Sequence, residues 1–200
     1  MNNLEMFCLT LEPDHYDFIT GLGYQPVGLG NQNFNKNWFT DKNDINISKK
    51  NKNYGEYTFH YWLWKNYIDL DQVKDGWFGF CQYRKFWSTE KNNLLPGTIN
   101  ELKPLVLAKI PESYENFDVI LGYPYFINQF KIMKFFKKGF NVITKNPSCL
   151  FDKNKRNLKF HFDLMHGYNN LNKAIDLLDA NNKNDFNDYV NSNVSFNPHN

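Results

Sequence analysis

Residues 77–83 read Trp-Phe-Gly-Phe-Cys-Gln-Tyr, a short apolar run that follows the turn dipeptide Asp75-Gly76. A run of this length after turn residues is typical of a buried strand. Two further runs have the same character, Leu4–Leu11 and Asp118–Leu121, and a shorter extended piece covers Tyr24–Val27. The sequence therefore predicts a sheet of short, buried strands.

Helical periodicity is clearest over Tyr54–Ile68, where large side chains recur on one face. We expect core packing from three aromatic residues of that face, Tyr57, Tyr61 and Trp64. Further helices are predicted over Asn100–Ala108, Leu158–His166, Leu171–Asp179 and Asp185–Val190, and the polar stretch 31–53 is predicted to be loop. Strands that alternate with helices indicate an α/β fold, a mixed sheet flanked by helices, with extra helices toward the C-terminus.

The composition fits a single domain over residues 1–200. The hydrophobic content of 42% is modest, but 18% of the residues are aromatic and supply large buried areas. The formal net charge of +2 gives no reason to expect a nucleic-acid partner. Three widely spaced cysteines without a C-x-x-C pair indicate free thiols. Because no leader peptide or membrane-spanning apolar run is evident, we expect a cytoplasmic protein.

Several stretches resemble the motifs of one known domain family. The signature N-I-S-x-K-N-x-x-Y-x-E-L-T-x-x-Y-W-x-W-K-N is approached by Asn46-Ile47-Ser48-Lys49, Asn53-Tyr54-Gly55-Glu56-Tyr57-Thr58 and Tyr61-Trp62-Leu63-Trp64-Lys65-Asn66. Residues 79–87 (GFCQYRKFW) resemble G-L-C-H-Y-R-R-Y-F, residues 117–121 resemble Y-D-V-I-L, and residues 196–200 resemble the start of Y-P-Y-N-M-F. These motifs belong to an uncharacterised domain family of capsular and exopolysaccharide glycosyltransferases.

The resemblance implies a GT-A-like (Rossmann-like) fold. It also implies transfer of a sugar from a nucleotide-diphosphate donor to a glycan or lipid-linked glycan acceptor, in the synthesis of capsular polysaccharide, exopolysaccharide or lipopolysaccharide. Gln82 stands where the family usually has His, and Lys85 where it usually has Arg. The chain stops at Asn200, whereas the family continues, so we expect a truncated C-terminal section. The early stop at Asn200 supports an alternative function, a non-catalytic nucleotide-sugar or glycan-binding module. A third possibility, an RNA-binding protein, is disfavoured by the near-neutral net charge.

A sugar transferase must neutralise the charge that builds on the leaving diphosphate, and GT-A enzymes usually do so with a metal held by D-x-D after a strand. Here the strand runs instead into Arg84 and Lys85. Guanidinium and ammonium groups both pair with phosphate oxygens, so we predict these two as the catalytic clamp. The alternative is a sheet-edge Arg84 paired with a structural carboxylate. The literal D-x-D at residues 69–71 follows a helix and is expected to be solvated loop, so Mn²⁺ or Mg²⁺ is not favoured and no metal ligand is predicted.

Glu56 and His60 lie four residues apart on one helix face, where a carboxylate and an imidazole could position or activate a hydroxyl, or fix a buried helix. Thr10 ends the first strand, where sheets of this kind meet a nucleotide base. The resemblance assigns substrate binding to the residues at motif positions, namely Tyr54, Glu56, Thr58, Trp62, Gln82 and Tyr83.

Asp163 is predicted to be a catalytic residue that faces the acceptor. His161 and His166 lie near the same helix face. A metal site is disfavoured there because a fourth, correctly spaced ligand is missing. Lysines interleave with phenylalanines over residues 130–138, a pattern of a solvated helix face or of peripheral membrane contact near a lipid-linked acceptor. The lysines of this cluster are Lys131, Lys134, Lys137 and Lys138.

Overall fold

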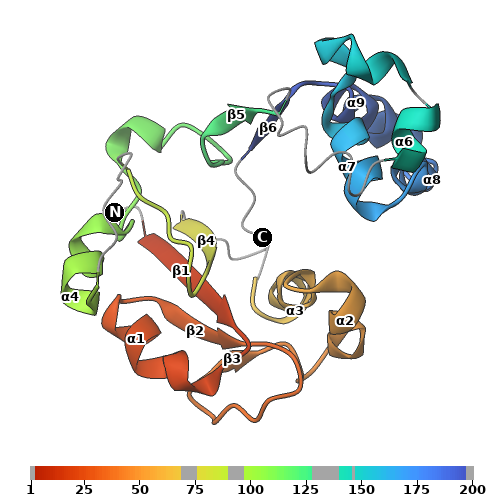
Figure 1. Cartoon of the computed structure of the whole chain (residues 1–200). Helices are drawn as coiled ribbons and strands as arrows, with labels where there is room; N and C mark the ends of the chain where they lie inside the picture. The colour runs from red at the N-terminus through yellow and green to blue at the C-terminus, as the bar shows by residue number, and fades with distance from the viewer. Residues whose placement is uncertain (1–2, 69–75, 90–96, 128–139, 146, 197–200) are drawn as a thin grey trace. The chain divides into compact units, whose positions relative to one another are not determined.

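The computed structural model describes residues 3–68, 76–89, 97–127, 140–145 and 147–196 (Figure 1). These divide into two compact units, which we call unit 1 (up to Ile120) and unit 2 (from Leu121). The single domain expected over residues 1–200 stays a prediction, because compactness alone does not show whether either unit folds by itself.

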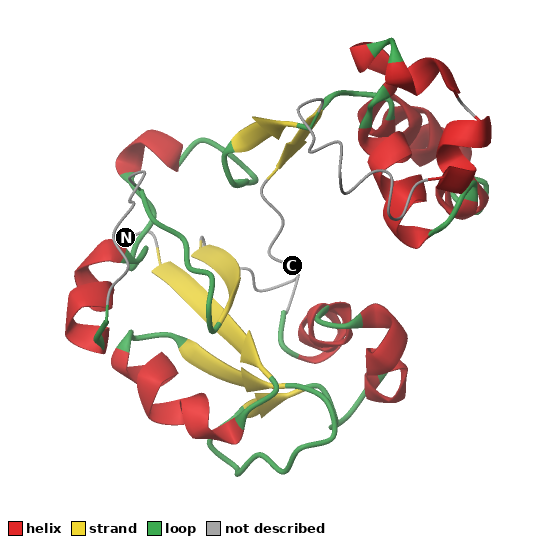
Figure 2. Cartoon of the chain, in the orientation of Figure 1, coloured by secondary structure: helices red, strands yellow, loops and turns green. Residues whose placement is uncertain are grey.

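Unit 1 is built on a four-stranded sheet with the order β3-β2-β1-β4 (Figures 1 and 2). Its strands are β1 (Asn3–Thr10), β2 (Gln25–Gly28), β3 (Phe39–Thr40) and β4 (Gly76–Gln82). All three pairings in it are parallel, in place of the mixed sheet expected. The α/β class is confirmed, since parallel neighbours need crossover connections and these carry the helices.

The central strand β1 has a continuous buried apolar run, Met6–Leu9, because helices cover both faces of the sheet. Met6 and Cys8 pack with Ile19 of helix α1 (Tyr16–Gly21) on one face. Phe7 and Leu9 pack with helix α3 (Tyr57–Asn66) on the other face. A 3₁₀ turn, η1 (Pro13–His15), leads from β1 into α1. This double covering is a Rossmann-like arrangement.

The helix predicted over Tyr54–Ile68 is two helices, α2 (Asn51–Tyr54) and α3, preceded by the 3₁₀ turn η2 (Ser48–Lys50). Gly55 separates them with φ of 54°, a conformation that glycine adopts without a Cβ clash. The side chains of α3 that face the sheet are Thr58, Phe59 and Leu63, all buried.

The predicted core role of the aromatic stripe on α3 is wrong for two of its members. Tyr57 is 60% exposed and Trp64 is 51% exposed, while Tyr61 is half-buried. The smaller residues Thr58 and Leu63 let the helix approach the sheet closely, and Phe59 fills the gap, so the larger rings lie on the opposite side.

The remaining chain of unit 1 forms short turns: α4 (Ile99–Leu102), η3 (Lys103–Leu105) and η4 (Glu112–Tyr114). The helix predicted over Asn100–Ala108 is thus shortened, because Pro104 has no N–H to continue it. The strand predicted at Asp118–Leu121 is wrong. These residues make no ladder with any described strand, and Val119 and Leu121 are 67% and 57% exposed.

Unit 2 carries the helices expected toward the C-terminus, namely α6 (Phe140–Lys145), α7 (Leu158–His166), α8 (Asn170–Ile175) and α9 (Ala180–Val190). The side chains of Asn157 and Asp179 cap α7 and α9 by accepting hydrogen bonds from first-turn amides. Two 3₁₀ turns, η5 (Pro147–Leu150) and η6 (Lys153–Lys155), precede α7. The antiparallel pair β5 (Pro124–Phe126) and β6 (Val194–Phe196) completes the unit.

Within the described ranges, the helices fall short of the length and apolarity that crossing a bilayer would demand.

Candidate functional site

A pocket of about 410 Å³ opens at the carboxyl ends of β1 and β4. Because β2 and β3 lie on one side of β1 and β4 lies on the other, the chain direction across the sheet reverses between β1 and β4. Parallel α/β sheets bind ligands at such a switch point. This switch-point pocket is lined by Leu9, Thr10, Leu11, Glu12, Leu29, Asn51, Gly55, Glu56, Gln82, Tyr83 and Arg84.

Thr10 lies at the wall of this pocket that β1 provides. Its hydroxyl oxygen accepts a hydrogen bond of 3.1 Å from the backbone N–H of Glu12. The same oxygen lies 2.8 Å from Nδ1 of His15. Thr10 is 4% exposed. The contacts of its hydroxyl with Glu12 and His15 fix the loop after β1 where that loop meets the pocket.

Glu56 brings a carboxylate to the opposite wall. It is the residue before α3, and its Oε2 accepts a hydrogen bond of 3.0 Å from the side-chain amide of Gln82. Gln82 ends β4, so this bond joins two motif positions that lie 26 residues apart. A carboxylate held by one oxygen in a pocket can receive a proton from a hydroxyl ligand or orient it.

Tyr83 and Arg84 extend from the end of β4 along the pocket. The Tyr83 ring stacks on the His15 imidazole with centroids 4.3 Å apart. The guanidinium carbon of Arg84 lies 5.8 Å from the centroid of the Tyr83 ring. Arg84 is exposed, and it forms no ion pair with any carboxylate of the described residues. A guanidinium in this position can pair with an anion in the pocket.

Of the residues predicted as site residues, the structure gathers Thr10, Glu56, Gln82, Tyr83 and Arg84 in this one pocket. Lys85 does not line it; its backbone N–H closes a turn onto the carbonyl of Gln82 at 3.0 Å. The role of Lys85 in the clamp stays a prediction.

Three other predicted substrate-binding residues lie outside the lining. Thr58 is fully buried, donates to the Gly55 carbonyl and accepts from Asn51, which locks the α2–α3 turn. The indole of Trp62 donates to the Asn43 carbonyl at 3.0 Å and packs against the core. Tyr54 is 49% exposed. These contacts give Thr58 and Trp62 structural roles, and substrate binding by Tyr54, Thr58 and Trp62 stays a prediction.

Asp163 belongs to unit 2, where it is 3% exposed and forms an ion pair of 2.9 Å with Lys159, one helical turn away. Burial lowers the pKa of His161 on the same helix, so its imidazole is neutral. The rings of His166 and Phe162 lie 4.5 Å apart. An acceptor-side role for Asp163 stays a prediction.

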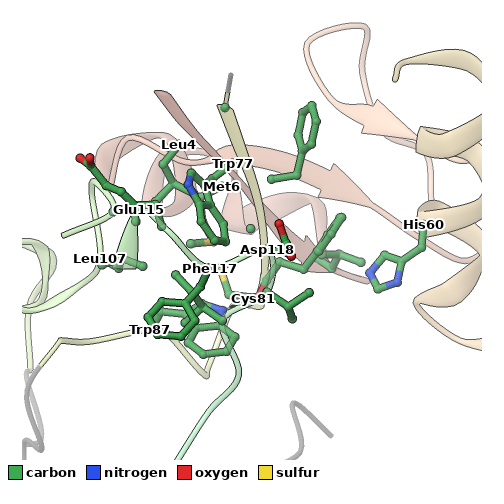
Figure 3. Close-up of a pocket in the computed structure, with 18 of the residues that line it drawn as sticks. Leu4, Met6, His60, Trp77, Cys81, Trp87, Leu107, Glu115, Phe117 and Asp118 are labelled. Atoms are coloured by element: carbon green, nitrogen blue, oxygen red, sulfur yellow. Dashed lines mark hydrogen bonds between the residues drawn. The ribbon is translucent and has the colours of Figure 1, made fainter. Parts of the chain in front are cut away.

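A larger pocket of about 960 Å³ lies along β4 in unit 1 (Figure 3). Leu9 and Glu56 line both pockets. Its walls are mainly apolar, with Leu4 and Met6 from β1 and Trp77 from β4. Its charged lining residues are acidic, namely Glu56, Glu115 and Asp118, with His60 beside them, and no Lys or Arg of the described residues lines it. The switch-point pocket is also lined by two acids, Glu12 and Glu56, but it adds the guanidinium of Arg84, which makes it the better candidate of the two for an anion.

Sequence reasoning missed two residues near the switch point, His15 and Asn51, and one buried acid after the edge strand β3, Asp41. His15 contacts both Thr10, five residues before it, and Tyr83, which only the pairing of β1 with β4 brings beside it. Asn51 lines the pocket and matches the K-N of the quoted signature, which was the signal that could have found it. Asp41 follows β3, is 1% exposed, and neither of its oxygens has a hydrogen-bond partner among the described residues.

The cysteines offer no nucleophile in unit 1. Cys8, Cys81 and Cys149 are buried free thiols, as predicted. The hydrogen bond with Cys8, together with burial, raises the pKa of Cys81, so that thiol stays protonated at neutral pH. Across the ranges that the structure describes, no three His, Cys, Asp or Glu side chains converge as a metal-ligand group.

Two predicted features lie outside the described residues. They are the D-x-D at residues 69–71 and the lysine cluster of residues 131–138.

The chain was compared with known proteins and structures. A family model described as "Domain of unknown function (DUF4422)" matches residues 9–197. None of the curated proteins and none of the solved structures matches the chain.

Proposed function

The chain belongs to the DUF4422 family, and we propose that it is a glycosyltransferase that moves a sugar from a nucleotide-diphosphate donor to a glycan acceptor. The observation that supports this best is Arg84, a guanidinium at the switch point of a parallel sheet that no described carboxylate neutralises. Ligand phosphates commonly lie at this place in α/β sheets.

In the proposed reaction an acceptor hydroxyl attacks the anomeric carbon of the donor, and the bond from that carbon to the diphosphate oxygen breaks. Negative charge then grows on the diphosphate. A fixed guanidinium that pairs with its oxygens stabilises this charge more in the transition state than in the ground state. Arg84 supplies that charge from the end of β4.

Glu56 takes the proton of the acceptor hydroxyl in this proposal. Its carboxylate is oriented by the Gln82 amide and lines both pockets, so an acceptor can approach it from the larger, mainly apolar pocket. Thr10 and Tyr83, both in contact with His15, form the wall on which the nucleoside end of the donor would lie. The proposed setting is the cytoplasmic synthesis of a surface polysaccharide.

A thermal-shift panel tests donor binding. Uridine, guanosine, cytidine and thymidine nucleotide sugars are each added to the full chain in EDTA and again with Mn²⁺. A ligand that binds only the folded state raises the melting temperature, so we expect at least one donor to do so in EDTA.

Donor hydrolysis or transfer to added acceptors, followed by chromatography, then tests the catalytic step. Release of the nucleoside diphosphate supports a transferase. Stabilisation without any turnover overturns the enzymatic part and favours a nucleotide-sugar-binding module, and no stabilisation by any donor overturns the proposal.

A further inference from the structure

The hairpin of α2 and α3 carries a second set of large aromatic side chains, which belong to neither core cluster of the described part of unit 1, although Tyr57 also lines the larger pocket. Tyr54, Tyr57 and Trp64 are 49%, 60% and 51% exposed, whereas Phe59 and Leu63 on the inner face are buried. Exposed aromatic groups gathered on one short segment mark an interaction surface.

Positive charge is concentrated on the same segment. Residues 48–66 carry four lysines, Lys49, Lys50, Lys52 and Lys65, and one acid. Four lysines against one glutamate leave +3 on the hairpin, more than the +2 of the whole chain. The acid is Glu56, which turns inward to Gln82, so the outer face presents lysine alone.

The lysines cover the rings. The ammonium of Lys65 lies 3.4 Å from the Trp64 ring centroid and 6.0 Å from that of Tyr61, and Lys50 lies 5.9 Å from that of Tyr54. A sugar stacks on an open aromatic face, and here ammonium groups lie over the rings of Tyr54, Tyr61 and Trp64. Tyr and Trp combined with Lys are instead the side chains that settle among lipid headgroups, with rings at the interface and ammonium groups on phosphates.

We propose that the outer face of α2 and α3 docks on an anionic membrane surface. The inner side of the same hairpin lines the switch-point pocket through Asn51, Gly55 and Glu56. Docking therefore places the pocket beside the lipid surface. If the proposed function holds, this deepens it, because the acceptor is then a lipid-linked glycan presented at the membrane.

Flotation of the full chain with vesicles tests the proposal. We expect binding to phosphatidylcholine vesicles that contain phosphatidylglycerol, little binding to phosphatidylcholine alone, and loss of binding at high salt. The double variants Tyr57→Ser/Trp64→Ser and Lys50→Glu/Lys65→Glu should each weaken binding by about tenfold or more. The matched control Tyr114→Ser/Lys109→Glu, which changes an exposed ring and an exposed lysine elsewhere, should bind like wild type.

A second readout does not depend on loss of binding. Trp64→Phe keeps an aromatic ring, so it should still float with vesicles but lose the lipid-dependent shift and the brominated-lipid quenching of tryptophan emission. Failure of the wild type to bind anionic vesicles, or equal binding by all variants, overturns the proposal. Binding to soluble polysaccharide in place of vesicles also overturns it. Donor binding is measured separately by thermal shift, so failure of the membrane proposal and failure of the transferase proposal are distinguishable.

Discussion

Gln82 donates a hydrogen bond of 3.0 Å from Nε2 to Oε2 of Glu56, which joins the end of β4 to the start of α3. Both residues line the switch-point pocket. The bond gives the Glu56 carboxylate a fixed direction. Glutamine and histidine side chains can both donate an N–H, so Gln82 can make this hydrogen bond at a position where the resembled motif has histidine.

Gln82→Leu should lower the rate of sugar transfer by about a hundredfold, because the Glu56 carboxylate loses the donor that orients it. Donor affinity should stay within about twofold of wild type, since phosphate binding relies on Arg84. Steady-state kinetics and calorimetry measure the two quantities. Gln82→His, which keeps an N–H donor, is the control and should retain most activity. Full turnover by the leucine variant would show that the bond has no catalytic part.

Thr10→Val should lower the free energy of unfolding by about 1 kcal/mol, because the Glu12 N–H loses its acceptor. Thr10→Ser keeps the oxygen and should be close to wild type. Urea unfolding of the three proteins measures the difference. Equal stability of the valine variant and wild type would contradict the anchoring role given to Thr10.

Asp41→Asn should raise the free energy of unfolding by about 1–3 kcal/mol, because a buried carboxylate without partners among the described residues costs its desolvation. Asp44→Asn, which changes an exposed residue of the same loop, should have little effect. Urea unfolding at neutral pH is again the measurement. A less stable Asp41→Asn variant would mean that other interactions stabilise the charge of the Asp41 carboxylate, and it would contradict this prediction.

Stability in acid should depend on His161. Burial lowers its pKa from the ordinary value of 6.5, so the folded state favours the neutral imidazole and the unfolded state takes up a proton first. The contribution of the neutral His161 to the free energy of unfolding is therefore complete above pH 6.5. It is lost as the pH falls toward the lowered pKa of the folded state. His161→Gln should flatten the pH dependence of urea unfolding between about pH 7 and pH 5. An unchanged slope would contradict this assignment.

Three of the four strands of unit 1 were predictable from local pattern, whereas β3 lies in the stretch 31–53 that was predicted to be loop. The apolar run of β4 and the polar residues that end it were visible in sequence, and so was Arg84 as a charge beyond a buried strand. The α/β class followed from the alternation of elements, and α7 begins and ends at the predicted residues, Leu158 and His166.

The errors arose where tertiary contacts decide. The residues of α3 show aromatic periodicity on one face, yet the face that packs on the sheet is the one with Thr58, Phe59 and Leu63. Helical periodicity identifies an apolar face, but it does not decide which of two apolar faces packs on the sheet. The apolar run at Asp118–Leu121 reads as a strand, but a strand also needs a ladder partner, and no described strand supplies one. His15 could not be found because it reaches Tyr83 only across the pairing of β1 and β4.

Calorimetric titration of nucleoside diphosphates into the full chain in EDTA addresses the role of Arg84 without a kinetic assay. At least one should bind, and Arg84→Ala should weaken that binding by about tenfold to a hundredfold, as expected for lost charge-assisted hydrogen bonds to phosphate. The control Lys36→Ala removes an exposed positive charge elsewhere in unit 1 and should leave the affinity unchanged. Equal affinity of the wild type and Arg84→Ala, or binding that appears only with Mn²⁺, would contradict a guanidinium that takes the place of the metal.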